Sequence, residues 1–349
     1  MKRSAPFLIL LALLSGVVAC SSDASTRSGA ADAGPTTTAA PVTVPTSVPA
    51  GTTLRVGDQL DYLKTVLHLA HQDEDLPYKV AYSAFVGGPA MLQAFQAGAI
   101  DTGFVASTPL IFAQAGGQPI RAVAGWASEH GSYGLLTAPG HDDIKGWADL
   151  KGKRVAFQQG TAGEAALLQA LDDVGLKLSD VKAVNLPQTQ ITAALQGGSA
   201  DAGLSVEPLT SVYLGQNPTA EKVEKTSEIT DRSFFVIASD PTLHDEAKTA
   251  ALADYVGRLV RSFVYLQKHP DLVAQAVYVQ TYHLPADRAA DIVKENGTTG
   301  FITLPGPLAR QQQRLADLFQ ANGEIPQKLD TSQEFDTRFN HLVQQEATS

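Results

Sequence analysis

A repeated segment, offset by 100 positions, is the feature of this sequence that most restricts its fold. Residues 94–104 read AFQAGAIDTGF and residues 194–204 read ALQGGSADAGL, with five identical positions. In each copy a helical segment ends at a glycine, a short turn carries an aspartate, and a strand begins near a second glycine. A supersecondary unit that occurs twice predicts two similar lobes. Chance similarity between two helix ends is the alternative.

Short β-branched runs alternate with helical periods from Thr52 onward. We expect strands at residues 54–56, 78–82, 102–105, 120–125, 154–157, 181–185, 202–205 and 233–239. We expect helices at residues 60–70, 90–96, 109–115, 163–174 and 191–195, and mainly helical sequence after residue 239. The pattern restarts after residues 132–137. This order predicts βαβ units, and therefore an α/β fold in which each lobe is a mostly parallel sheet flanked by helices.

The N-terminus has the features of a secretory signal peptide. Lys2 and Arg3 precede an apolar run at residues 7–14, and small residues lead to Cys20. The run is well short of the roughly 20 residues that a membrane-spanning helix needs. Its end resembles a bacterial lipobox, which implies cleavage before Cys20, lipidation of the thiol and acylation of the new amino terminus by a chain such as palmitate. The alternative is an ordinary signal peptide with an incidental cysteine.

A tether is expected between this anchor and the folded body. Residues 21–51 contain no Leu, Ile, Phe, Tyr or Trp, so they cannot bury enough apolar surface to offset the entropy of ordering. The chain is therefore divided into a signal peptide at 1–19, the lipidated Cys20 with its flexible tether at 20–51, a first lobe at 52–125 and 234–349, and a second lobe at 126–233.

Composition limits the class of partner. The formal charge is −10, charged residues make 18% of the chain, and no dense stripe of Lys and Arg is visible, which argues against a nucleic-acid binder. A single cysteine forms no internal disulfide. We expect neither a cofactor nor a metal, and we expect a monomer.

Loops at the ends of the expected strands hold the candidate ligand-binding residues. In open α/β sheets ligands bind outside the carboxyl ends of the strands, so two facing lobes predict a cleft between them. Polar residues and glycines concentrate in the loops at these ends. The expected ligand-binding residues are Asp58, Gln59, Gly87, Gly88, Ser107, Thr108, Gln159, Gly160, Thr161 and Glu207.

Six stretches carry a resemblance to one family. They are residues 56–57 (VG), 87–89 (GGP), 97–103 (AGAIDTG), 109–117 (PLIFAQAGG), 149–157 (DLKGKRVAF) and 323–326 (GEIP). Together they resemble, over about residues 52–330, the extracytoplasmic solute-binding proteins of ABC importers, in the branch that takes aliphatic sulfonates, taurine and nitrate.

The resemblance implies a two-lobed periplasmic-binding-protein-like fold of type II. Two crossing strands, near residues 120–125 and 233–238, would serve as the hinge for closure around a small ligand. It also implies a membrane permease as partner and a location on the extracytoplasmic face of the bacterial cell membrane. The protein is then a transport subunit rather than an enzyme.

The same resemblance indicates an anionic ligand. The run from Gly87 to Pro89 fits the start of a helix, with backbone N–H groups open to a ligand. The run from Gly160 to Gly163 looks like the matching element of the second lobe. Helix N-termini bind anions without arginine, so a sulfonate or a related sulfur compound is the expected ligand. Glycines that serve only to start helices are the alternative.

Two acidic residues depart from the family pattern. Asp58 lies beside Gln59 where the sulfonate binders often carry Gln or Lys without an acid, and Glu207 precedes Pro208 where they often place an aromatic residue and Asp-Pro. Unpaired acids would repel a sulfonate and favour an amine, a pyrimidine, a vitamin precursor or another neutral or cationic solute. Glu207 pairing with a cation near the hinge is the alternative. Glu164, in a first helical turn, is expected to complement the helix dipole.

Five other side chains are candidates for binding a metal or an organic ligand. His68 and His71 lie three residues apart before an acidic turn, where a solvated surface is favoured over a metal site. Trp126, Tyr133 and Tyr213 lie near the expected hinge and cleft rim, where core packing competes with stacking on an organic ligand.

Enzymes of the same fold are a further alternative. Aryl-sulfinate desulfinases use a cysteine nucleophile, and thiamine-precursor synthases use sites rich in His and Cys. Catalysis of the first kind requires a thiol in the cleft, whereas the cysteine of this chain is the expected lipid anchor. A tethered sensor or adhesin also stays open.

Overall fold

Six strands form sheet A in the order β11-β4-β10-β3-β1-β2. The computed structural model describes residues 44–130, 133–223 and 233–348, so the signal peptide, Cys20 and most of the expected tether lie outside the described residues. The strands are β1 (Thr53–Gln59), β2 (Lys79–Phe85), β3 (Thr102–Ala106), β4 (Ile120–Ser128), β10 (Ser233–Ser239) and β11 (Thr299–Ile302). Strands β2, β1 and β3 pair in parallel, whereas β10 pairs antiparallel with β3 and β4, and β11 pairs antiparallel with β4.

Five strands form sheet B in the order β7-β6-β8-β5-β9. They are β5 (Tyr133–Thr137), β6 (Arg154–Phe157), β7 (Lys182–Asn185), β8 (Ala202–Val206) and β9 (Lys222–Val223). Strands β7, β6 and β8 are parallel, and β5 is antiparallel to β8 and β9. Both sheets are therefore mixed rather than mostly parallel as expected, because antiparallel strands extend a block of three parallel strands in each. Strands β4 and β10, predicted to cross between lobes, are neighbours within sheet A; the chain crosses after β4 and returns before β10.

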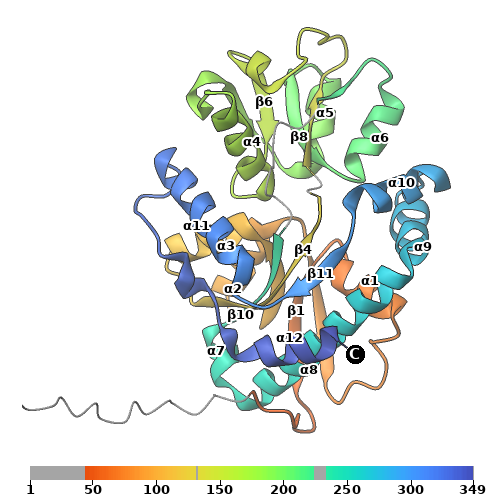
Figure 1. Cartoon of the computed structure of the whole chain (residues 1–349), viewed down its shortest axis with the longest axis vertical. Coiled ribbons are helices and arrows are strands. Elements are labelled where there is room, and N and C mark those ends of the chain that lie inside the picture. The colour runs from red at the N-terminus through yellow and green to blue at the C-terminus, as the bar shows by residue number, and fades with distance from the viewer. Residues whose placement is uncertain (1–43, 131–132, 224–232, 349) are drawn as a thin grey trace, which may run out of the picture. The chain divides into compact units, whose positions relative to one another are not determined.

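Twelve α-helices pack around these sheets in the described ranges (Figure 1). They are α1 (Tyr62–Leu69), α2 (Gly88–Gln96), α3 (Ser107–Ala115), α4 (Ala162–Asp173), α5 (Ile191–Gln196), α6 (Leu209–Gln216), α7 (Asp240–His244), α8 (Glu246–Lys268), α9 (Pro270–Val273), α10 (Ala286–Asn296), α11 (Gly306–Ala321) and α12 (Asn340–Ala347). A π-helical segment, Ala274–Thr281, follows α9. Within the described residues, no helix combines the length and apolarity needed to cross a membrane.

The sequence repeat corresponds to a repeated structural unit. In sheet A the carboxylate of Asp101 accepts hydrogen bonds from the backbone N–H of Arg55 (2.9 Å) and from its guanidinium (2.5 Å). In sheet B Asp201 makes the same pair of bonds with Arg154, at 2.7 and 2.5 Å. Burial opposes ionisation of both carboxyls, but the bonds from arginine outweigh it and hold their pKa values below the ordinary range. Each aspartate thereby ties the turn after a helix to the first residues of the neighbouring strand.

A large core covers one face of sheet A beneath α1 and α8. It includes Trp126, which is 2% exposed and stacks on Phe234 with ring centroids 5.5 Å apart. Val44 and Val48, from the end of the segment expected to be a tether, also pack against this core. Burial of this apolar surface stabilises the packing of α1 and α8 against sheet A.

A separate hydrophobic cluster joins the helices of the two sheets, and we call it the inter-sheet cluster. Helix α4, which follows β6 of sheet B, lies directly above α3 and α11 in Figure 1. The buried members of the inter-sheet cluster are Ile111, Ala165, Leu168, Leu315, Ala316, Phe319, Ile325 and Leu329. Because these side chains come from α3, α4, α11 and the segment after α11, their burial holds α4 against the helices of sheet A.

Candidate functional site

Three helix N-termini, those of α2, α3 and α4, lie together. A Cβ on Gly88, at the start of α2, would overlap the ring of Pro109 in the first turn of α3. A Cβ on Gly160, just before α4, would lie 3.4 Å from Cγ of Pro89 in the first turn of α2. The absence of a side chain at Gly88 therefore lets the first turns of α2 and α3 approach closely, and the loop before α4 lies within van der Waals range of the start of α2.

The N-terminal turns of these helices carry positive electrostatic potential. The N-cap residues are Gly87, Ala106 and Thr161, and none of them caps its helix with a side-chain hydrogen bond. The first N–H groups of a helix have no acceptor within it, and the helix dipole adds partial positive charge there. An anion is the ligand that such ends accommodate.

Two hydroxyl groups at the start of α3 are buried without a partner. Ser107 is 3% exposed and Thr108 is fully buried. Neither Oγ of Ser107 nor Oγ1 of Thr108 has a hydrogen-bond partner among the described residues. A buried hydroxyl left unpaired costs free energy, which an oxygen of a bound ligand would recover.

The predicted glutamines make contacts within the chain. The Nε2 of Gln59 donates to the carbonyl of Phe104 at 2.8 Å. The Nε2 of Gln159, on the loop before α4, donates to Oε2 of Glu324 at 2.9 Å. Thr161 donates its hydroxyl to the carbonyl of Gln158 at 2.6 Å. These side chains shape the site and join the α4 loop to the segment after α11.

Asp58 is engaged by the start of α1. The side chain is fully buried, and its two oxygens accept the backbone N–H groups of Leu63 and Lys64, each at 3.0 Å. Burial raises the pKa of the Asp58 carboxyl above its ordinary value, while these backbone hydrogen bonds oppose the rise. Asp58 therefore serves as a cap for α1 and has its acceptor capacity used there.

Glu207 is paired with an arginine from a distant part of the sequence. Its Oε1 lies 3.2 Å from Nη2 of Arg288 in α10, and its Oε2 accepts the hydroxyl of Ser211 at 2.7 Å. Arg288 also donates to Oγ of Ser211 and pairs with Glu295. The sequence offered no signal for Arg288, which lies within a long helical tail. Neither Asp58 nor Glu207 is therefore unpaired, which is the condition under which these acids would repel an anion.

Glu164 is a buried part of the site at the N-terminus of α4, whereas its sequence pattern indicated only an interaction with the helix dipole. The side chain is fully buried in the first turn of α4, and its Oε2 accepts the backbone N–H of Gly160 at 2.8 Å. Its Oε1 has no hydrogen-bond partner among the described residues. Burial and the nearby charge of Glu324 raise the pKa of Glu164 to about 7, against the opposing effect of the Gly160 bond.

The aromatic side chains that are candidates for stacking on an organic ligand pack mainly in the cores. Trp126 belongs to the sheet A core, as described above. Tyr213 is 1% exposed and donates its hydroxyl to the carbonyl of Thr137 at 2.9 Å, and burial raises its pKa to about 12. Tyr133 is half-buried, and its ring approaches Gly163 in the first turn of α4. Tyr133 is therefore the member of this set that borders the site.

The two candidate metal ligands are exposed. His68 Nδ1 lies 2.9 Å from Asp73 and His71 Nδ1 lies 3.3 Å from Glu74, with both histidine side chains more than 70% exposed. No group of three or more potential metal ligands occurs among the described residues.

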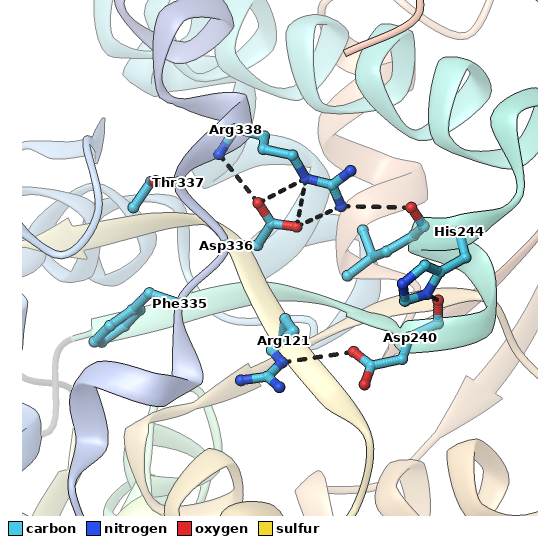
Figure 2. Close-up of a pocket in the computed structure, with 8 residues that line it drawn as sticks. Arg121, Asp240, His244, Phe335, Asp336, Thr337 and Arg338 are labelled. Atoms are coloured by element: carbon cyan, nitrogen blue, oxygen red, sulfur yellow. Dashed lines mark hydrogen bonds and ion pairs between the residues drawn. The ribbon is translucent and has the colours of Figure 1, made fainter. Parts of the chain in front are cut away.

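Two surface hollows lie at the end of sheet A that is opposite to the starts of α2 and α3. One, of about 360 Å³, is shown in Figure 2, where Arg121 faces Asp240, and Arg338 faces Asp336. The charged groups labelled there pair with one another, at 3.5 Å for the first pair and 2.6 Å for the second. The other, of about 460 Å³, borders the clasp between Arg55 and Asp101. None of the predicted ligand-binding residues lines either hollow.

A buried carboxyl behind α3 is expected to make stability depend on pH. Glu334 is 2% exposed and neither of its oxygens has a partner at hydrogen-bond geometry, although Gln312 lies close. Burial raises its pKa to about 8, so the folded state holds this proton more tightly than the unfolded state. The contribution of Glu334 to the free energy of unfolding is then complete below about pH 4.5 and is lost as the pH rises toward 8. We expect the melting temperature to fall by several degrees between pH 5 and 9.

The control is Glu334→Gln, which keeps the shape of the side chain and removes its titration. We expect the fall in melting temperature to be smaller in this variant, with the difference concentrated between pH 5 and 8. A variant whose melting curve tracks the wild type at every pH would contradict the assignment to Glu334.

Comparison with known proteins gives the family of this chain. Residues 79–271 match the family described as NMT1/THI5 like. The chain is 31% identical over 283 residues to a protein of Escherichia coli strain K12 described as an aliphatic sulfonates-binding protein, covering 80% of this chain and 87% of the relative. A protein of Bacillus subtilis with the same description is 25% identical over 275 residues, which covers 78% of this chain and 80% of the relative.

Solved structures show the same fold. The alkanesulfonate-binding protein SsuA from Xanthomonas axonopodis pv. citri, bound to MOPS, matches with a TM-score of 0.72 and 25% identity, over 83% of this chain and 99% of that one. The periplasmic aliphatic sulphonate binding protein SsuA of Escherichia coli matches with a TM-score of 0.66 and 27% identity, over 81% and 92%. The predicted two-lobed, periplasmic-binding-protein-like α/β fold is confirmed, and the chain belongs to the NMT1/THI5-like family.

Proposed function

We propose that this protein is the substrate-binding subunit of an ABC importer and that its substrate is a small organic sulfonate. Lipids on Cys20 would hold it on the extracytoplasmic face of the membrane, with the tether running from Cys20 to the segment that packs on the sheet A core at Val44 and Val48. The lobes at 52–125 with 234–349 and at 126–233 would close on the ligand as a monomer and present the closed state to the permease. The names of its relatives supply the class of ligand.

The observation that carries this proposal is the meeting of three helix N-termini, from both sheets, whose N-cap residues make no side-chain capping hydrogen bond. A sulfonate has three oxygens that share one negative charge, so it can accept several N–H and O–H groups at once. The turns that begin at Gly88, Ser107 and Ala162 offer such donors. The buried hydroxyls of Ser107 and Thr108 would add two more.

The pairing of the two acids supports an anion over a cation. A cationic solute would need an ionised carboxylate free to accept it, yet Asp58 caps α1, Glu207 is paired with Arg288, and burial raises the pKa of Glu164 and favours its neutral form. The test is calorimetric titration of the purified protein with ethanesulfonate, taurine, nitrate, an alkylamine and a pyrimidine. Binding of a sulfonate supports the proposal, whereas binding of the amine or the pyrimidine with none of the anions contradicts it.

Thr108→Val is expected to weaken sulfonate binding without destabilising the fold. Valine has nearly the shape of threonine and removes a hydroxyl that has no partner within the chain. The loss of one hydrogen bond to a charged ligand corresponds to about 10- to 100-fold in Kd. Titration calorimetry measures the affinity and thermal melting measures the stability.

The matched control is Thr102→Val in β3. Thr102 is equally buried, but its Oγ1 donates to the carbonyl of Ile237 at 2.8 Å. We expect this variant to lose about 1–2 kcal/mol of stability and to keep the wild-type affinity. If Thr108→Val binds a sulfonate as well as the wild type does, the hydroxyl of Thr108 has no part in the site.

A further inference from the structure

Glu164 places a carboxyl group where the proposed anion has to bind. It is the third residue of α4, and its side chain folds back so that Oε2 accepts the N–H of Gly160, one residue before the N-cap Thr161. The carboxyl therefore covers the N-terminal turn of α4. In its ionised form it would compete with a bound anion for the same positive potential and repel it at short range.

The second observation is an unused oxygen. Glu164 is fully buried, and Oε1 has no hydrogen-bond partner among the described residues. A protonated carboxyl carries one O–H donor, which needs an acceptor when it is buried. An oxygen of a sulfonate at the N-terminal turn would be that acceptor.

The neighbours of Glu164 favour its neutral form. The charged group that acts on it from the sheet A side is the carboxylate of Glu324, after α11, which Gln159 holds at 2.9 Å. The side chains of α3 and α11 that meet α4 in the inter-sheet cluster are apolar. The ring of Tyr133 approaches from β5, and the backbone N–H of Gly160 is the donor on its own loop. No positively charged side chain acts on Glu164 among the described residues.

We propose that Glu164 couples anion capture to the uptake of one proton from solvent. In the bound state the carboxyl is neutral, its Oε1 donates a hydrogen bond to an oxygen of the sulfonate, and its Oε2 still accepts from Gly160. No bond of the ligand is made or broken. This inference rests on the proposed function, because it requires an anion at the N-terminus of α4.

The protonation state of Glu164 in the free protein sets the direction in which the Kd for a sulfonate depends on pH. The Glu164 carboxyl, whose pKa is about 7 in the free protein, has to be protonated before or during binding. Ethanesulfonate itself stays ionised across this range, so the ligand contributes no titration. We expect its Kd to be about tenfold higher at pH 8 than at pH 6.

The experiment is titration calorimetry of the wild-type protein with ethanesulfonate at pH 8, in two buffers that differ in ionisation enthalpy. The difference in observed heat gives the number of protons taken up, and we expect close to one. The dependence of Kd on pH between 5.5 and 8.5 is measured in parallel. Neither measurement depends on the folding of a variant.

Three variants assign the proton to its residue. Glu164→Gln keeps an acceptor for Gly160 and a donor for the ligand, so we expect binding that is independent of pH and as tight at pH 8 as wild-type binding at pH 6. Glu246→Gln, which removes an exposed acid from the first turn of α8, is the matched control and keeps the pH dependence. Glu334→Gln, whose carboxyl also titrates near this range, keeps it too.

Two outcomes would overturn the inference while leaving the proposed function intact. One is wild-type binding of ethanesulfonate without proton uptake and with a constant Kd. The other is pH-dependent binding that persists unchanged in Glu164→Gln. If ethanesulfonate and the other sulfonates fail to bind at any pH, in wild type and variant alike, the proposed function itself is wrong and the inference falls with it.

Discussion

Replacing Phe319 with alanine is expected to lower the free energy of unfolding by about 3–5 kcal/mol. Phe319 is fully buried in α11, and its ring meets that of Phe112 edge to face, with centroids 5.1 Å apart at 71°. It belongs to the inter-sheet cluster, which includes Ala165 and Leu168 of α4. The substitution removes apolar contacts and leaves a cavity where the helices of the two sheets meet. Urea denaturation, followed by circular dichroism, measures the loss.

Phe339→Ala is the matched control for this prediction. Phe339 is also fully buried, but it packs in the core of sheet A on the α8 side. We expect a similar loss of stability from both variants. Only Phe319→Ala should also weaken sulfonate binding, because only that cavity loosens α4 against α3. A loss below about 1 kcal/mol in Phe319→Ala would show that the inter-sheet cluster carries little of the stability.

Arg288→Gln is expected to cost about 3 kcal/mol of stability and to weaken the binding of a sulfonate. The side chain of Glu207 is 5% exposed, and Arg288 is the cation that neutralises it. Removing the guanidinium leaves a buried carboxylate that Ser211 alone still contacts. The uncompensated charge destabilises the fold, and it adds a negative potential that opposes an anion. Thermal melting and titration calorimetry together measure the two effects.

The double variant Glu207→Gln with Arg288→Gln separates charge from packing. It removes the carboxylate along with its partner, so we expect it to recover most of the lost stability and affinity. Lys294→Gln, an exposed position on the same helix, is expected to change neither. If the double variant is as destabilised as Arg288→Gln, the contribution of Arg288 comes from its packing rather than from neutralising Glu207.

The elements with local sequence signals were predicted well. Strands Arg154–Phe157 and Ser233–Ser239 were predicted with the residue bounds that the structure has. Helices α2, α3 and α4 begin one or two residues before the predicted starts. Buried strands flanked by glycine and helices that end at glycine leave strong local patterns, since each depends on neighbours within a few residues.

Strands β5, β9 and β11 are not among the expected strands. Strands β9 and β11 are short, at two and four residues, and each lies at a sheet edge. Strand β11 falls in the segment expected to be mainly helical, and its partner β4 lies more than 170 residues earlier in the chain. Pairing with such a distant strand, rather than its own pattern, makes this segment extended.

The candidate site also combines features that have a local sequence signal with features that depend on contacts between distant segments. Glycines followed by a helical run, as at Gly87 and Gly160, predict helix starts, and the structure has a helix after each. That these starts meet depends on the proximity of residues such as Gly160 and Pro89, which lie far apart in sequence. The partner of Glu207 was left open by the sequence for the same reason, because Arg288 is 81 residues away.

The sequence by itself determined that the protein contains two similar lobes. The repeat around Asp101 and Asp201 is a local pattern, and each aspartate meets an arginine at or near the start of a strand of its own sheet. The ionisation of the site was decided only by tertiary structure. Whether Asp58, Glu164 and Glu207 carry a free charge depends on burial and on partners supplied by other segments, and desolvation and Coulomb interactions act through space rather than along the chain.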